Sequence, residues 1–112
     1  MAAIFHIVPA SDWQHACARG SYAPASLAAE GFVHFSYQAQ VANTANARFA
    51  GRTDLVVVEY DPARLATPVV EEDLYGAGEL FPHIYAPIPT GLATAVHPLP
   101  RAADGRFRFA DE

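Results

Sequence analysis

The chain has 112 residues, of which 52% are hydrophobic and 17% charged, so we expect a single domain over residues 1–112 with one buried core. The net charge of -5 and the lack of a basic run argue against extended nucleic-acid binding, but a small nucleotide held by one or two arginines fits this balance. The single Cys17 excludes an internal disulfide bond and a zinc-finger spacing. No signal-peptide pattern or membrane span is visible, so a cytoplasmic location is expected, while the oligomeric state stays open.

The first third of the chain predicts one strand and two short helices. Residues 3–8 are mostly apolar and end at a proline, which is typical of a strand. Ser11 and Gln14 have the spacing of a capping box, so a helix is expected to begin there and to end near Arg19. Ser26 is in position to cap a single further turn.

A strand over residues 32–35 and the helix expected after it form the stretch around which the chain is organised. His34 is the one polar residue of this strand. Ser36 follows it where a helix N-cap belongs. Apolar residues four apart over residues 37–49 predict an amphipathic helix, with Arg48 near its C-terminal end.

The second half of the chain predicts mainly strands. Leu55–Tyr60 is apolar except for Glu59, which indicates a strand buried on both faces in the middle of a sheet. Residues 80–85 read as extended, but Pro82 cannot donate to a ladder, so this segment is expected at a sheet edge or interrupted. Three further strands are expected over residues 69–71, 93–99 and 106–109. Since helices come early and strands late, the fold class is predicted to be α+β.

Three histidines each interrupt a different apolar stretch. They are His6, His34 and His83. One such histidine would favour a satisfied core residue, but three in so short a chain favour convergence on one cleft. The residues expected beside them are Ser36, Arg48, Glu71 and Tyr85.

The residue types in this cleft leave several kinds of chemistry open. Three histidines could hold zinc with an open position, but they lack the tight spacing of a helical zinc motif, and no metal is expected. Glu71 and Glu72 belong either to an acidic loop or to the cleft, where one would pair with a ribose hydroxyl or a developing cation. Ser36 is better placed as a cap than as a nucleophile. No dinucleotide, P-loop or hydrolase-elbow motif is present.

Five segments of the chain together resemble the domain of unknown function 952 family. These are Phe5–Ile7, Trp13–Ala16, Glu30–Gln38, Ala45–Phe49 and Phe81–Tyr85. More distantly, the Val33–Ser36 run, the helix to Arg48 and the Val-rich strand before Asp61 resemble the RNA 2′-phosphotransferases. Those enzymes belong to the ADP-ribosyltransferase-like superfamily and use NAD.

This resemblance implies a compact, bent and split β-structure with short helices around a central cleft for nicotinamide and ribose. It implies a catalytic set of His6, His34 and Glu71, and a substrate- or cofactor-binding set of Ser36, Arg48, Glu72, His83 and Tyr85. His6 would hydrogen-bond the ribose, Glu71 or Glu72 would stabilise the centre left by nicotinamide, and His34 with Arg48 would bind phosphate or the acceptor.

The function expected from this resemblance is binding of NAD or an ADP-ribose-type ligand, or transfer of ADP-ribose. Two alternatives stay open. One is a non-catalytic ligand-binding or interaction module of the same fold, and the other is a zinc-dependent hydrolase.

Overall fold

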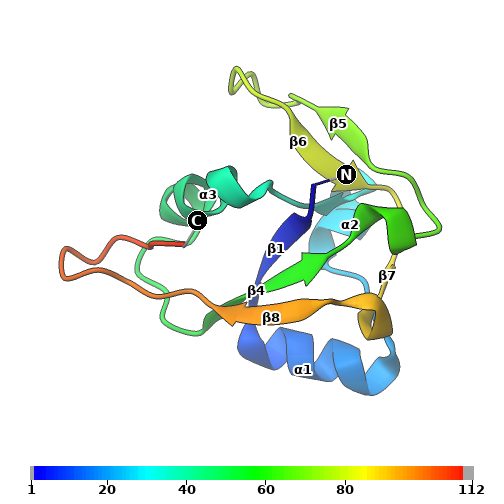
Figure 1. Cartoon of the computed structure of the whole chain (residues 1–112), viewed down its shortest axis with the longest axis horizontal. Helices are drawn as coiled ribbons and strands as arrows, with labels where there is room; N and C mark the ends of the chain where they lie inside the picture. The colour runs from blue at the N-terminus through cyan, green and yellow to red at the C-terminus, as the bar shows by residue number, and fades with distance from the viewer. Residues whose placement is uncertain (1, 110–112) are drawn as a thin grey trace.

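The computed structural model describes residues 2–109, in which short helices surround three antiparallel sheets (Figure 1). The strands are β1 (Ile4–Pro9), β2 (Ser21–Tyr22), β3 (Val33–His34), β4 (Leu55–Tyr60), β5 (Val70–Glu72), β6 (Phe81–Ile84), β7 (Ile88–Pro89) and β8 (Ala95–Pro98). The helices are α1 (Ala10–Arg19), α2 (Ala25–Glu30) and α3 (Val41–Arg48), with 3-10 turns η1 (Gln38–Gln40), η2 (Pro62–Arg64) and η3 (Thr90–Leu92).

The strands are distributed over two three-stranded sheets and one small pair. The first sheet has the order β1-β4-β8, the second has the order β3-β6-β5, and β2 pairs with β7. Phe5 of β1 and Ser36, just beyond β3, exchange two backbone hydrogen bonds of 2.8 and 2.7 Å, so the two larger sheets are joined at this point. Figure 1 shows α1 beneath β4 and β8, β5 and β6 at the opposite end, and α3 to one side.

β4 is the middle strand of the first sheet and is covered on both faces, as the apolar run predicted. Val57 points into a cluster that includes Val41 of α3 and Phe107. Val58 and Tyr60 point into a second cluster on the opposite face, which includes Trp13 of α1. Because strand side chains alternate between faces, two cores need an apolar residue at nearly every position, and β4 supplies them.

The three predicted serine caps, Ser11, Ser26 and Ser36, are wrong. α1 begins at Ala10 with Pro9 in the N-cap position, so Ser11 lies inside the first turn and caps nothing. Ser36 does not cap a helix either, because its backbone is paired with β1. A 3-10 turn separates it from α3, and Tyr37 donates its backbone N–H to the Gln40 side chain at 2.9 Å to begin that turn.

Of the two alternatives for residues 80–85, an edge position or an interrupted segment, the edge position is wrong, since β6 is the middle strand of its sheet. The Pro82 carbonyl accepts a hydrogen bond from the Phe35 N–H at 3.0 Å. The return bond would need an N–H at Pro82, but the β3 ladder has already ended at the His34–His83 pair. The proline therefore occupies the one place on this strand where a missing donor interrupts no ladder.

Of the three further expected strands, the one over residues 69–71 is found as β5, shifted by one residue, and the other two are shorter than predicted. Residues 93–99 contain β8, and the segment before Phe109 makes only an isolated bridge between Arg101 and Phe107.

α2 follows Pro24, so Ser26 lies within the helix and does not cap it.

Candidate functional site

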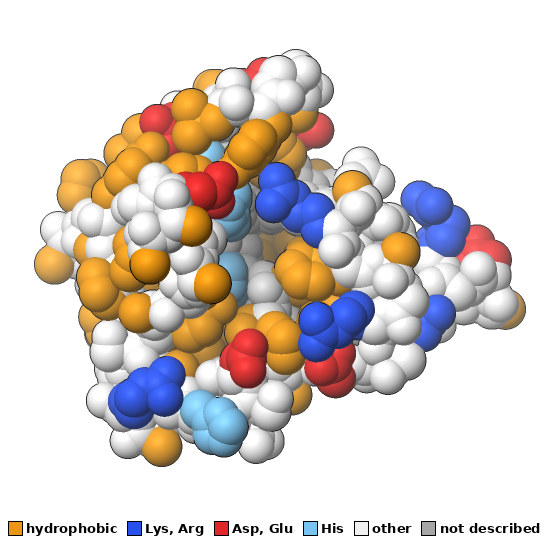
Figure 2. Space-filling model, turned by 180° about the vertical axis from the view of Figure 1, so that it is seen from behind, with side chains coloured by type: hydrophobic (Ala, Val, Ile, Leu, Met, Phe, Trp, Pro, Cys, Tyr) orange, Lys and Arg blue, Asp and Glu red, His pale blue; other side chains and the backbone are white. Residues whose placement is uncertain are grey.

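A cleft of about 520 Å³ lies where the two larger sheets meet, beside α3. Its walls come from β1, the β3 region, α3, β6 and the loop over residues 73–80. Of the predicted site residues, it is lined by His6, His34, Ser36, Arg48, Glu72 and His83. Figure 2 shows the hollow, with histidine side chains inside it and basic side chains along one border. Residues from both halves of the chain therefore meet at one concave surface, which is the usual form of a small-molecule site.

His6 is held on both sides of its ring by protein groups. Its Nδ1 contacts the backbone carbonyl of His34, and its Nε2 lies 2.7 Å from the Tyr22 hydroxyl. A carbonyl can only accept, so Nδ1 carries the proton and Nε2 accepts from the phenol. Burial lowers the pKa of His6 to about 4, so this ring is neutral at pH 7.

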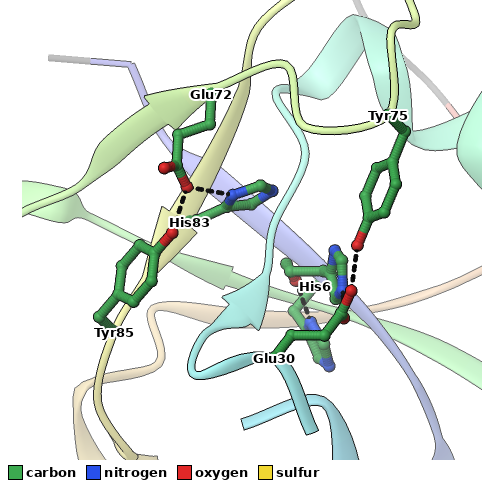
Figure 3. Close-up of polar contacts among 7 residues, drawn as sticks. His6, Glu30, Glu72, Tyr75, His83 and Tyr85 are labelled. Carbon is green, nitrogen blue, oxygen red and sulfur yellow. Dashed lines mark hydrogen bonds and ion pairs between the residues drawn. The ribbon is translucent and has the colours of Figure 1, made fainter.

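His34 belongs to a second network, which reaches from α2 to the loop over residues 73–80. Its Nε2 lies 2.7 Å from Glu30 Oε1, and the Tyr75 hydroxyl donates to the other oxygen of Glu30 (Figure 3). The Arg48 guanidinium lies 5.1 Å from the centre of the Tyr75 ring. The hydrogen bonds from Tyr75 and then from His34 lower the pKa of Glu30, whereas burial lowers the pKa of His34.

His83 belongs to a third network, which joins β5 and β6. Its Nδ1 lies 2.8 Å from Glu72 Oε1, and the same oxygen accepts a hydrogen bond of 2.5 Å from the Tyr85 hydroxyl (Figure 3). The face of the His83 ring is stacked on Phe32, with centroids 4.0 Å apart. The bonds from Tyr85 and His83 lower the pKa of Glu72, so this carboxylate is ionised at neutral pH.

Not every predicted site residue is part of the cleft wall. Glu71 accepts a hydrogen bond from the Tyr37 hydroxyl, and Tyr85 reaches the site only through Glu72; neither lines the cleft. Successive residues of a strand point to opposite faces, so only one of the two adjacent glutamates of β5 can face the histidines. The structure places Glu72 there. Ser36 lines the cleft, and its hydroxyl donates to Thr44 Oγ1 at 3.3 Å.

Three further residues take part in these networks and were not predicted; Tyr22 and Tyr75 line the cleft, and Glu30 bonds to residues that do. Glu30 precedes His34 by four residues in the segment that carries the resemblance, and this spacing was its only sequence signal. Tyr22 and Tyr75 come from segments without a distinctive pattern. Their hydroxyls reach His6 and Glu30 through contacts between residues distant in sequence.

The histidines are not arranged as a metal site. In the part of the chain from residue 2 to residue 109, no three His, Cys, Asp or Glu side chains lie close enough together to hold a metal ion. His6 has both ring nitrogens bonded to protein, and His34 and His83 each use one nitrogen for a carboxylate.

The fold and cleft define a small mixed α/β protein with short helices, antiparallel sheets and a histidine-lined cavity. The chain belongs to the DUF952 family, described as proteins of unknown function, whose model matches residues 7–96. No curated protein matches it. Among residues 2–109, the helices are all too short or too polar to cross a membrane.

The fold is similar to that of protein CC0527 from Caulobacter crescentus. The crystal structure of CC0527 is 30% identical, covers 96% of this chain and 94% of its own, and superposes with a TM-score of 0.85. The solution NMR structure of the same protein is 32% identical, covers 95% and 91%, and has a TM-score of 0.76.

Proposed function

We propose that this protein has an ADP-ribosyltransferase-like fold and that its cleft binds NAD or an ADP-ribose-type ligand and transfers ADP-ribose. The observation that supports this most is the meeting of His6, His34 and His83 in one cavity with Arg48 at its border. A ligand with both ribose hydroxyls and phosphates matches a site that offers both imidazoles and a guanidinium.

Arg48 is the group best placed to bind a phosphate. It is the only arginine among the residues that line the cleft, and the chain has no lysine. Among residues 2–109, it forms no ion pair with a carboxylate, and its guanidinium instead lies over the Tyr75 ring. Its fork of N–H donors can therefore bind two phosphate oxygens without first giving up an anionic partner.

The walls of the cleft suit a flat ring and a sugar. Aromatic side chains supply apolar surface on several sides, from Phe5, Phe35, Phe49 and Phe81. Polar side chains of α3 and the preceding turn line the same cavity, including Gln40, Asn43 and Thr44. An apolar pocket with a few polar groups at fixed positions is the usual design for orienting a small ligand.

The roles implied by the resemblance need two adjustments. Since both nitrogens of His6 are already bonded, the Tyr22 hydroxyl is better placed to accept from a ribose hydroxyl, and His6 orients that phenol. Glu72 replaces Glu71 in the proposed role, because of these two glutamates only Glu72 lines the cleft.

Binding can be tested by thermal-shift and calorimetric titration with NAD, ADP-ribose and nicotinamide. A ligand at about 100 times its Kd should stabilise the protein by about 2.7 kcal/mol. Arg48→Met should weaken NAD and ADP-ribose about tenfold or more but leave nicotinamide unchanged, because nicotinamide has no phosphate. Arg64→Met, at an exposed arginine that does not line the cleft, is the matched control. If neither NAD nor ADP-ribose raises the midpoint of thermal unfolding, the proposal is wrong.

A non-catalytic binding module of the same fold is the second candidate. The observation in its favour is that His6 is neutral and fully hydrogen-bonded within the protein, which is typical of a structural histidine. Release of nicotinamide from bound NAD separates the two candidates, since a binding module leaves NAD intact.

A further inference from the structure

His83 is buried yet keeps one polar atom open to the cleft. Only 2% of its surface is exposed. Within residues 2–109, Nδ1 is bonded to Glu72 and no partner exists for Nε2, although no fully buried side-chain nitrogen or oxygen there lacks one. Nε2 must therefore keep the small exposed area of the ring. Because His83 lines the cleft, that area opens into the cleft.

The tautomer of the neutral His83 ring follows from its hydrogen-bond partner. The Glu72 carboxylate can only accept, so the Nδ1 of neutral His83 carries the proton and Nε2 carries a free lone pair. Stacking on Phe32 and the Tyr85 hydrogen bond to Glu72 fix the ring and its carboxylate. A carboxylate that orients an imidazole and stabilises its charged form is a recurrent arrangement for proton transfer.

We infer that His83 is the catalytic base of the cleft, that Glu72 is its positioning residue, and that the substrate it activates is a hydroxyl compound, with water as the simplest case. This inference rests on the proposed function. The hydroxyl oxygen forms a bond to C1′ of the nicotinamide ribose of NAD, and its proton passes to Nε2 of His83. The bond between C1′ and the ring nitrogen breaks, its electron pair stays with nicotinamide, and nicotinamide leaves as a neutral molecule. His83 then returns the proton to water.

The other two histidines are less suited to this step. His6 has no free ring nitrogen. His34 also pairs with a carboxylate, but its side chain is 26% exposed and that of Glu30 is 37% exposed, so the pair is less firmly held than the buried His83 ring. The titratable groups that face His83 are Glu72 from β5 and His34 from β3, whose ring centroid is 5.4 Å away.

The test follows nicotinamide release from NAD across pH, with bound ADP-ribose as a separate measure of the site. The wild-type rate should rise along one limb as an imidazole loses its proton. His83→Ala should lower the rate by about 10²- to 10⁴-fold, and added imidazole should restore part of it by filling the space beside Phe32. His34→Gln should cost much less.

Glu72→Gln should slow the reaction and shift the apparent pKa of the limb, because the imidazolium loses its counter-charge. Nitrogen NMR should show the Nδ1–H form of His83 in the wild type and a mixture of forms in Glu72→Gln. Glu59→Gln is the matched control, since Glu59 bonds to His97 Nε2 at 2.7 Å and neither residue lines the cleft. It should leave rate and pH profile unchanged.

The outcomes separate this inference from the proposed function. Failure of NAD and ADP-ribose to bind overturns both. Binding without nicotinamide release, or release that His83→Ala leaves unchanged, overturns the role of His83 alone and leaves the binding proposal in place. A pH profile identical in wild type and Glu72→Gln overturns the positioning role of Glu72.

Discussion

His34 and His83 lie directly opposite each other on β3 and β6, and their rings are 5.4 Å apart with an angle of 79° between their planes. Each ring bonds to its own carboxylate, Glu30 for one and Glu72 for the other. Two imidazoliums at this distance repel each other, so the charge of one ring disfavours the charge of the other.

The first prediction concerns this coupling. Besides the larger effect of burial, the proximity of His83 and of Arg48 lowers the pKa of His34. His83→Gln and Arg48→Met should therefore each raise the pKa of His34, measured by NMR titration of its ring protons. His97→Gln, which does not touch the cleft, should leave it unchanged. If the pKa of His34 is the same in His83→Gln and in the wild type, the two rings are not coupled.

The second prediction concerns stability in mild acid. Because the pKa of His6 is lowered to about 4 in the folded protein, the unfolded chain binds a proton between pH 4 and its ordinary value of 6.5 that the folded protein does not. The free energy of unfolding should therefore fall as the pH falls through this window, by up to about 3 kcal/mol from His6.

His6→Asn provides the comparison for this measurement, because the Asn amide can still donate to the His34 carbonyl. Urea unfolding at several pH values should show a weaker pH dependence in the variant than in the wild type. Equal slopes in the two proteins would mean that His6 titrates normally.

The third prediction concerns the Tyr22 hydroxyl. Tyr22→Phe removes the donor to Nε2 of His6 and leaves a desolvated acceptor unpaired, which should cost about 1–3 kcal/mol in the free energy of unfolding. The hydrogen bond stabilises the neutral ring, so its loss should also raise the pKa of His6. Tyr37→Phe removes an exposed hydroxyl contact to Glu71 and should cost about 0.5 kcal/mol or less. Equal losses in the two variants would contradict the arrangement around His6.

The fourth prediction concerns the apolar wall. Phe49 follows α3, packs against the cluster around Val57, and lines the cleft. Its truncation to Ala should cost about 2–3 kcal/mol in chemical denaturation, because the ring is only partly buried. Val96→Ala, at a side chain that is 49% exposed, should cost less than about 0.5 kcal/mol. If Phe49→Ala lowers the free energy of unfolding as little as Val96→Ala does, the Phe49 ring is exposed to solvent.

The sequence predicted those features that depend on local pattern. The apolar run within Leu55–Tyr60, broken only by Glu59, placed β4 between two cores. Histidines inside three apolar stretches predicted one shared cavity, and His6, His34 and His83 line one cleft. In both cases the signal is the presence or absence of a polar residue on a strand, which burial constrains strongly.

The features that sequence reasoning missed depend on contacts between distant segments. Ser36 has the residue type and position of a cap, but backbone pairing with Phe5 uses its N–H and carbonyl instead. Pro82 would normally mark an edge, and only the early end of β3 makes its central position tolerable. The choice of Glu72 over Glu71 follows from the register of β5 on β6, which no local pattern sets.

The backbone pairing between Phe5 and Ser36 ties the two larger sheets together beside the cleft. His6 lies on β1 in one of these sheets, and His83 lies on β6 in the other, next to β3. The contact of the His6 ring with the His34 carbonyl links the same two sheets close to these two backbone bonds. A ligand that pushes the two walls of the cleft apart is expected to weaken these hydrogen bonds. A ligand that contacts both walls is expected to keep them formed. The rates of hydrogen exchange at the Phe5 and Ser36 amides should therefore report how far the two walls of the cleft separate, without a probe inside the cleft.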